Sequence, residues 1–144
     1  MKTILPIDIV TLGEDNSFHL FVSCSIDGDK YDMLIDTGAS HTIFDATLIP
    51  EMPAEETAGH NIQSAGIHAG ELKTGFGIIK KFKISNLKRS KWVVVLIDLT
   101  HVNELYKKFT DKRVAGLIGS DFLLEHKAII DYKKKKLVLR KIKC

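Results

Sequence analysis

The stretch Met33-Leu34-Ile35-Asp36-Thr37-Gly38-Ala39-Ser40 places a carboxylate and a glycine directly after a run of apolar residues. The residues 31–36 have the pattern of a short strand, and this strand passes without a break into Thr37 and Gly38, which favour a turn. A surface turn would by itself explain an Asp and a Gly at this place. Whether this stretch is a surface turn or part of a functional site therefore depends on the rest of the chain.

A second motif lies about eighty residues downstream, at Gly116-Leu117-Ile118-Gly119-Ser120-Asp121-Phe122-Leu123. Leu117, Ile118 and Gly119 form an apolar pair and a glycine that we expect at the end of a strand, immediately before a helix. Between the two motifs the chain is rich in glycine, which predicts a long, mobile hairpin. Its glycines are Gly59, Gly66, Gly70, Gly75 and Gly77.

The remaining chain alternates short β-branched runs with turn residues, which predicts a mostly β protein. Further strands are expected at 4–11, 19–26, 80–84, 91–97, 128–132 and 137–140, whereas 45–59 is expected to be loop. Two short helices are predicted, one capped by Thr100 and one capped by Ser120. The first would bury one face made of Val102, Leu105, Tyr106 and Phe109.

The order of these parts resembles the retropepsin family of aspartic peptidases. In that family an Asp-Thr/Ser-Gly loop is followed by a flap hairpin, an apolar-apolar-glycine strand and a short helix. The resemblance covers residues 18–139, and it is nearest to cellular, bacterial-type members. It implies one all-β domain over residues 1–144, with the closed, barrel-like retropepsin-type acid protease fold and one or two short helices.

The resemblance also implies roles for individual residues. Asp36 would be the catalytic carboxylate, and Thr37 would hydrogen-bond across to a partner loop. Gly38, Ala39 and Ser40 would support the active-site loop, and Leu117, Ile118 and Gly119 would form the second structural motif. The flap would contact substrate through Ser64, Ala65, Gly66, Ile67 and His68.

Aspartic peptidases activate a water molecule between two carboxylates that share one proton, because two like charges held so close cannot both ionise easily. This chain contains a single Asp-Thr-Gly. The active form is therefore expected to be a two-fold symmetric homodimer that cleaves a peptide or protein substrate. Retroviral members have an acidic residue in place of Ser40 and an arginine in place of Ser120, so the ion pair between them is absent here.

A rival interpretation keeps the same fold but gives it no hydrolytic role, as a module for homodimerisation or peptide docking. The intact Asp36-Thr37-Gly38 favours the enzyme, because a docking module has no chemical need of that carboxylate.

Composition restricts the other classes of function. The net charge of +3 is too small to argue for nucleic acid, and Lys133–Lys136 is expected to be a solvated turn. The six histidines show no metal-ligand spacing, so neither a metal nor a cofactor is expected. No stretch approaches the ~20 apolar residues of a membrane-spanning helix, and no secretory signal is evident. These features favour a cytoplasmic protein without a membrane partner.

Overall fold

The computed structural model describes residues 1–13, 17–53 and 74–142. This part of the chain is mostly β, as the sequence predicts, with two short helices, α1 (Thr100–Lys107) and α2 (Ser120–Glu125). Neither helix is long and apolar enough to cross a membrane. The strands are β1 (Lys2–Pro6), β2 (Asp8–Leu12), β3 (Ser17–Ile26), β4 (Asp29–Ile35), β5 (Ile43–Asp45), β6 (Thr74–Ile84), β7 (Leu87–Ile97), β8 (Val114–Ile118), β9 (Ile129–Asp131) and β10 (Lys136–Arg140).

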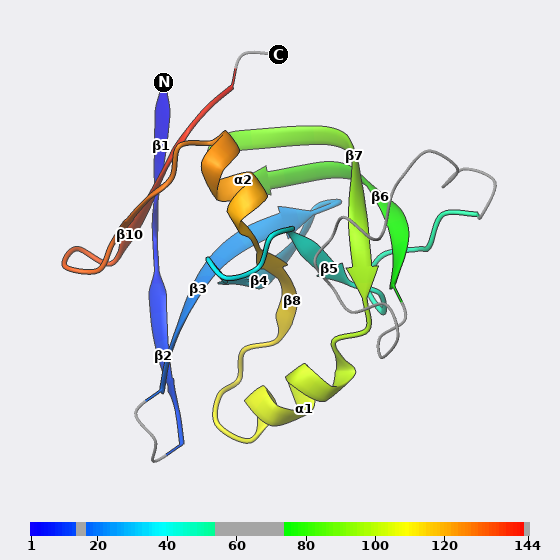
Figure 1. The fold of residues 1–144 in the computed structure, drawn as a ribbon, viewed down its shortest axis with the longest axis horizontal. Coiled ribbons are helices and arrows are strands. Elements are labelled where there is room, and N and C mark those ends of the chain that lie inside the picture. Colours follow the sequence, from blue (N-terminus) through cyan, green and yellow to red (C-terminus); the bar gives the residue numbers. More distant parts are fainter. Residues whose placement is uncertain (14–16, 54–73, 143–144) are drawn as a thin grey trace.

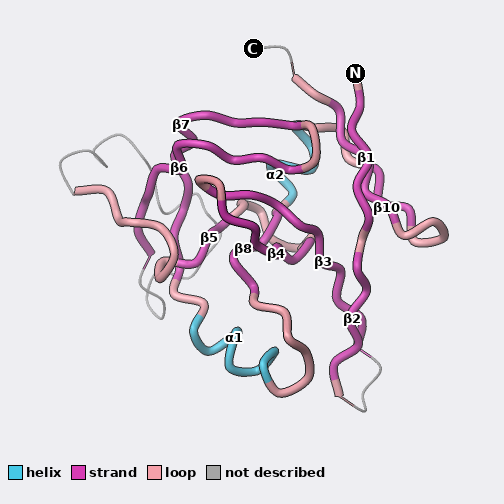
Figure 2. Tube along the Cα trace, turned by 180° about the vertical axis from the view of Figure 1, so that it is seen from behind, coloured by secondary structure: helices cyan, strands magenta, loops and turns pink. Residues whose placement is uncertain are grey.

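The main sheet curls into a barrel (Figure 1). Its strand order is β2-β3-β4-β8-β5-β7-β6, and an additional pairing of β6 with β3 closes the ring, which leaves β2 as an extension of β3. Two of its pairings are parallel, β4 with β8 and β5 with β7. A separate sheet of three strands, in the order β1-β10-β9, lies beside the barrel (Figure 2).

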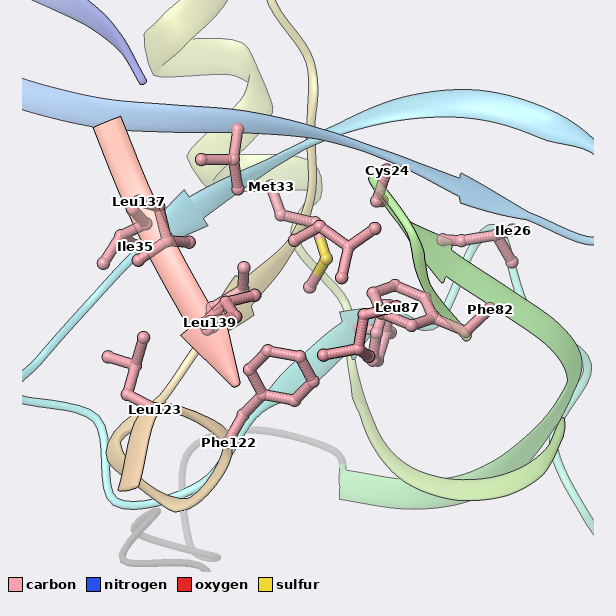
Figure 3. Close-up of a cluster of buried hydrophobic side chains, with 14 of the residues drawn as sticks. Cys24, Ile26, Met33, Ile35, Phe82, Leu87, Phe122, Leu123, Leu137 and Leu139 are labelled. Atoms are coloured by element: carbon pink, nitrogen blue, oxygen red, sulfur yellow. The ribbon is translucent and has the colours of Figure 1, made fainter. Parts of the chain in front are cut away.

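The main core fills the barrel and continues under the second sheet. In Figure 3, Leu137 and Leu139 of β10 approach Ile35 of β4 and Phe122 and Leu123 of α2. The inward-facing positions of each strand are almost all aliphatic or aromatic, as expected where side chains alternate between a core and solvent. Because β10 and α2 share this core with β4, the elements that flank Asp36 are held by the same packing.

The structure differs from the predicted elements in several places, and β6 and β7 begin earlier than the strands predicted at 80–84 and 91–97. The strand predicted at 4–11 is two strands, because the N–H of Ile7 donates to the carbonyl of Lys135 while Asp8 begins the pairing of β2 with β3. The loop predicted at 45–59 begins only after β5, a strand that the sequence analysis missed. Of the predicted face of α1, Tyr106 is buried, but Leu105 is 50% exposed and Phe109 is also exposed.

The helix starts also differ from the prediction. Thr100 and Ser120 are the first helical residues, and the capping positions are occupied by Leu99 and Gly119. Thr100 instead receives its support from Asp98, whose carboxylate accepts hydrogen bonds from the Thr100 amide and hydroxyl.

A buried histidine joins α2 to β10. The Nδ1–H of His126 donates to the carbonyl oxygen of Arg140 at 2.8 Å, and Nη2 of Arg89 donates to His126 Nε2, also at 2.8 Å. The Arg89 guanidinium lies over the ring of Trp92 and is paired with Glu125. Since arginine can only donate, this arrangement requires a neutral imidazole, and His126 is only 3% exposed.

We expect this histidine to make the fold less stable in mild acid. Burial lowers the pKa of His126 more than the bond to the Arg140 carbonyl raises it, and the charge of Arg89 lowers the pKa as well. As the pH falls, His126 is therefore protonated in the unfolded chain before it is protonated in the folded protein. The stability that the neutral His126 contributes is lost as the pH falls below the pKa of a histidine in the unfolded chain, about 6.5. Urea unfolding at pH 7.5 and pH 5 should show a smaller pH-dependent loss for His126→Asn than for the wild type. Equal losses in both proteins would contradict this expectation.

Candidate active site

Asp36 directly follows β4 and is positioned by the neighbouring strand β8. The two strands run parallel, with Leu34 opposite Leu117 and Ile35 opposite Ile118. The N–H of Asp36 donates a hydrogen bond to the carbonyl oxygen of Ile118 at 2.9 Å. This pairing fixes the start of the Asp36 loop beside the apolar-apolar-glycine motif and leaves Asp36 partly exposed.

The loop after Asp36 turns its own amides back toward this residue. The N–H of Gly38 donates to Asp36 Oδ1 at 3.0 Å, and the N–H of Ala39 donates to the Asp36 carbonyl oxygen at 3.1 Å. A Cβ atom at Gly38 would lie 3.4 Å from Asp36 Oδ1, which is ordinary contact. The contribution of Gly38 that the structure shows is therefore the amide that it donates to the Asp36 carboxylate.

The loop at the end of β8 interlocks with the Asp36 loop. The N–H of Ser120 donates to the carbonyl oxygen of Ala39 at 2.8 Å, and the N–H of Gly119 donates to Thr42 Oγ1 at 3.0 Å. A Cβ atom at Gly119 would lie 2.6 Å from both the carbonyl carbon and the carbonyl oxygen of His41. Because backbone cannot easily move aside, the close approach of the two loops requires glycine at this position.

Asp121 ties the same loop to the start of α2. Its Oδ1 accepts hydrogen bonds from the Thr42 hydroxyl at 2.7 Å, the Thr42 N–H at 2.9 Å and the Phe122 N–H at 2.7 Å. Its Oδ2 lies 3.8 Å from Nδ1 of His41. Thr42 is buried and bridges Asp121 to Gly119, so it couples the two motifs through its hydroxyl.

Helix α1 packs against the face of the sheet that carries Asp36. Tyr106 shares an apolar cluster with Leu34 and Leu117, the residues on either side of the β4–β8 pairing. Burial raises the pKa of Tyr106, and the negative charge of Asp36 raises this pKa further. The Tyr106 hydroxyl forms a hydrogen bond of 2.8 Å with Nδ1 of His19. These contacts place α1 within the electrostatic reach of Asp36.

The structure brings the two sequence motifs together but does not test every predicted role. Thr37 and Ser40 lie exposed on the loop, and a weak contact of 3.4 Å links the Ser120 hydroxyl to the Ser40 carbonyl. The bond of Thr37 to a partner loop stays a prediction. The predicted flap residues Ser64, Ala65, Gly66, Ile67 and His68 lie outside the described residues.

Two of the glycines that predicted a mobile hairpin instead belong to a strand. Gly75 and Gly77 lie in β6, opposite Leu96 and Val94 of β7. A Cβ atom at Gly77 would lie 2.9 Å from the carbonyl oxygen of Pro50, and one at Gly75 would lie 2.7 Å from a carboxylate oxygen of Glu51. Glu51 forms an isolated antiparallel bridge with Gly77, and the N–H of Met52 donates to the carbonyl of Phe76 at 2.7 Å, so both glycines lie where residues 51–52 pair beside β6. The mobility of the predicted hairpin stays a prediction.

The residues that support the loop were not recognised from sequence. Thr42 and Asp121 are 79 residues apart, and although Asp121 lies in the second sequence motif, nothing in the sequence signalled its pairing with Thr42. Asp45, at the end of β5, is buried as well and accepts hydrogen bonds from the amides of Thr47 and Leu99. Among the residues that the structure describes, no three His, Cys, Asp or Glu side chains gather as a metal site would require.

Comparisons with known proteins agree with this geometry. A family model described as "Aspartyl protease" matches residues 22–122. The retroviral protease-like domain of Ddi1 from Leishmania major is similar in structure, with a TM-score of 0.52 and 20% identity over 86% of this chain and 90% of that chain. A retropepsin-like aspartic protease from Rickettsia conorii gives a TM-score of 0.46 and 18% identity over 98% and 94% of the two chains. No curated protein matches the chain. At these identities the structural likeness to the Leishmania domain shows the fold alone.

Proposed function

Because the chain belongs to the aspartyl protease family, whose model spans both sequence motifs, we propose that it is an endopeptidase with Asp36 as its catalytic residue. The observation that carries this proposal is the Asp36 loop itself. Its carboxylate is partly exposed, accepts the Gly38 amide and stands on a loop locked to the end of β8. A catalytic group needs both qualities, because it must meet the substrate and must also be held in place.

The reaction would use two Asp36 carboxylates, one ionised and one protonated, with a water molecule between them. The ionised carboxylate accepts a proton from the water molecule while the oxygen of this water attacks the peptide carbonyl carbon. The protonated carboxylate gives its proton to the carbonyl oxygen, so a tetrahedral diol forms. The carboxylate that took the proton from water then gives it to the amide nitrogen, the C–N bond breaks and the amine leaves. The other carboxylate accepts a hydroxyl proton of the diol as the carboxylic acid product forms.

Both carboxylates would come from copies of the same chain. The sequence contains one Asp-Thr-Gly, and the neighbouring acidic residue Asp121 is engaged in holding Thr42 and the start of α2. A homodimer with a two-fold axis beside Asp36 supplies the second carboxylate in the same loop conformation. The substrate would be a peptide or an extended segment of a protein.

The dependence on a second chain gives the proposal a direct test. If two chains form one site, activity per chain should fall as the protein is diluted through its dimer dissociation constant. The measurement is cleavage of a broad peptide library over a wide range of enzyme concentrations, with the mass in solution followed in parallel. Constant activity per chain in a sample shown to be monomeric would contradict the two-chain site.

A further inference from the structure

A row of polar side chains crosses four neighbouring strands on the outer face of the barrel. Ser25 of β3 is opposite Lys30 of β4 on one side and opposite Lys83 of β6 on the other, and Lys83 is in turn opposite Lys88 of β7. Directly opposite residues share one face of a sheet, with Cβ atoms about 5 Å apart. The three lysines are exposed, so this lysine row places a serine between two lysines on the solvent side.

The lysine row borders a pocket of about 340 Å³. The side chains that can donate hydrogen bonds into this pocket are those of Ser23, Ser25, Lys30, Lys83 and Ser85. None of the described residues that line it is acidic. Three hydroxyls and two ammonium groups therefore face one hollow of the surface, which is a donor set for an anion.

The positive charges of the lysine row are not neutralised by the protein itself. The ion pairs formed within the described part of the chain include none of its three lysines. Lys83 and Lys88 are also directly opposite each other, and like charges in that position destabilise a sheet. An anion bound over the row would remove this repulsion.

The acidic residues nearest in sequence are directed elsewhere. The Oδ1 of Asp27 accepts a backbone N–H of β6 at 2.9 Å. The Oδ1 of Asp32 lies 3.7 Å from Nζ of Lys112. Asp29 directly precedes Lys30 in β4, so its side chain projects from the opposite face of the sheet. The lysine row therefore keeps its charges for a ligand from outside the chain.

The hydroxyls of the pocket are available as donors. The N–H of Asn86 donates to Thr3 Oγ1 at 3.3 Å, and the Thr3 hydroxyl donates to Ser85 Oγ at 2.9 Å. Ser85 accepts in this chain of bonds, so its own hydroxyl proton can be given to a ligand. Ser23 Oγ lies 3.4 Å from Asp32 Oδ1, a distance too long for a strong hydrogen bond, so Ser23 can also turn to a ligand.

We propose that this pocket binds a phosphate group, either as free phosphate or as a phosphomonoester on a side chain of another protein. A phosphate group carries close to two negative charges at neutral pH and has three strong acceptor oxygens, which match two ammonium groups and three hydroxyls. A carboxylate would offer a single charge and two oxygens in one plane. The pocket includes no residue of the Asp36 loop, so phosphate binding is separate from the proposed hydrolysis.

The pocket is tested by inorganic phosphate. A titration at pH 7.5 and constant ionic strength, followed through the backbone amide NMR shifts of Ser25 and Ser85, should show saturable binding. Lys83→Gln should raise the dissociation constant at least ~10-fold, because hydrogen bonds between charged groups are the strong ones. The matched control is Lys133→Gln in the exposed turn between β9 and β10, which loses the same charge and should bind like the wild type.

Three results would overturn the proposal. They are a wild type without saturable binding, a Lys83→Gln protein that binds phosphate like the wild type, and an equal loss of binding in Lys83→Gln and Lys133→Gln. The last result would show that binding follows the net charge of the protein and not this pocket.

The source of the phosphate group is tested with a short phosphoserine peptide and its unphosphorylated form. If the phosphopeptide binds at least ~10-fold more tightly than inorganic phosphate, the natural ligand is a phosphorylated protein. Equal affinities of the two support free phosphate as the ligand. If the unphosphorylated peptide binds as tightly as the phosphopeptide, the pocket does not recognise phosphate and the proposal is overturned.

A carboxylate built into the lysine row should take the place of the ligand. Ser25→Glu sets a negative charge between Lys30 and Lys83, so it should raise the thermal midpoint by about 2 °C relative to the neutral matched variant Ser25→Gln. It should also weaken the binding of inorganic phosphate at least ~10-fold, because the glutamate repels the anion. A Ser25→Glu protein that melts no higher than Ser25→Gln, or that binds phosphate like the wild type, would show that the lysines do not converge over Ser25 and would contradict the proposed site.

Discussion

Asp36→Asn should abolish peptide hydrolysis while the protein stays folded and dimeric. The amide keeps nearly the shape of the carboxylate but can neither accept the proton of the attacking water nor carry the shared proton. We expect a loss on the order of 10³-fold or more, since the change removes the base and the acid together at a two-fold site. The thermal midpoint should be unchanged or higher, because two acids crowded on one axis repel each other.

The measurement is cleavage of a broad peptide library at pH 4 to 7, with thermal melts of both proteins. Asp29→Asn is the matched control, because Asp29 is an exposed aspartate at the start of the same strand. Undiminished cleavage by Asp36→Asn would remove Asp36 from the mechanism. Absence of cleavage by the wild type as well would favour the rival module for homodimerisation or peptide docking.

Asp45→Ala should cause the largest loss of stability among single changes outside the apolar core. Asp45 is 1% exposed and accepts hydrogen bonds from the Thr47 amide at 3.1 Å, the Thr47 hydroxyl at 2.8 Å and the Leu99 amide at 3.1 Å. The Arg113 guanidinium also lies 3.4 Å from its Oδ2. The carboxylate thus joins β5 to the segment between β7 and α1.

Alanine at this position leaves the buried Leu99 amide without its partner and removes the anion beside Arg113. We expect the free energy of unfolding to fall by about 3 kcal/mol, as for other buried charged networks that lose one member. Equilibrium unfolding in urea gives this value, with Asp29→Ala as an exposed control on β4. If the loss in the free energy of unfolding exceeds that of the control by less than about 0.5 kcal/mol, water replaces these hydrogen bonds without cost and the prediction is contradicted.

The core of the candidate site was predictable from sequence because both of its motifs are local. The apolar run before Asp36 and the Leu117–Gly119 motif each carry their own signal, and parallel pairing of β4 with β8 brings them together. The mostly β class followed from the short β-branched runs, whereas the barrel was expected only from the resemblance to the retropepsin family.

The contacts that hold the Asp36 loop in place were not predictable, because they join residues that are far apart in the sequence. The bond between Thr42 and Asp121 exists only once the barrel has closed, and β5 is three residues long and offers little periodicity. The place of Gly77 also depends on a distant contact, since it pairs antiparallel with Glu51 and a Cβ atom there would lie 2.9 Å from the carbonyl oxygen of Pro50. Phe109 was expected in the core from its spacing on α1, but the helix ends before it and leaves it exposed.

The central claim is that one active site takes an Asp36 from each of two chains, and mixing wild type with Asp36→Asn tests it most directly. The two proteins are combined at a constant amount of wild type and increasing amounts of the variant, allowed to exchange subunits, and assayed for peptide cleavage. If both carboxylates are needed, mixed dimers are inactive, and a ninefold excess of the variant should lower the activity per wild-type chain by about 10-fold. If that activity stays constant at every ratio while mixed dimers are present, one Asp36 suffices and the two-chain site is contradicted.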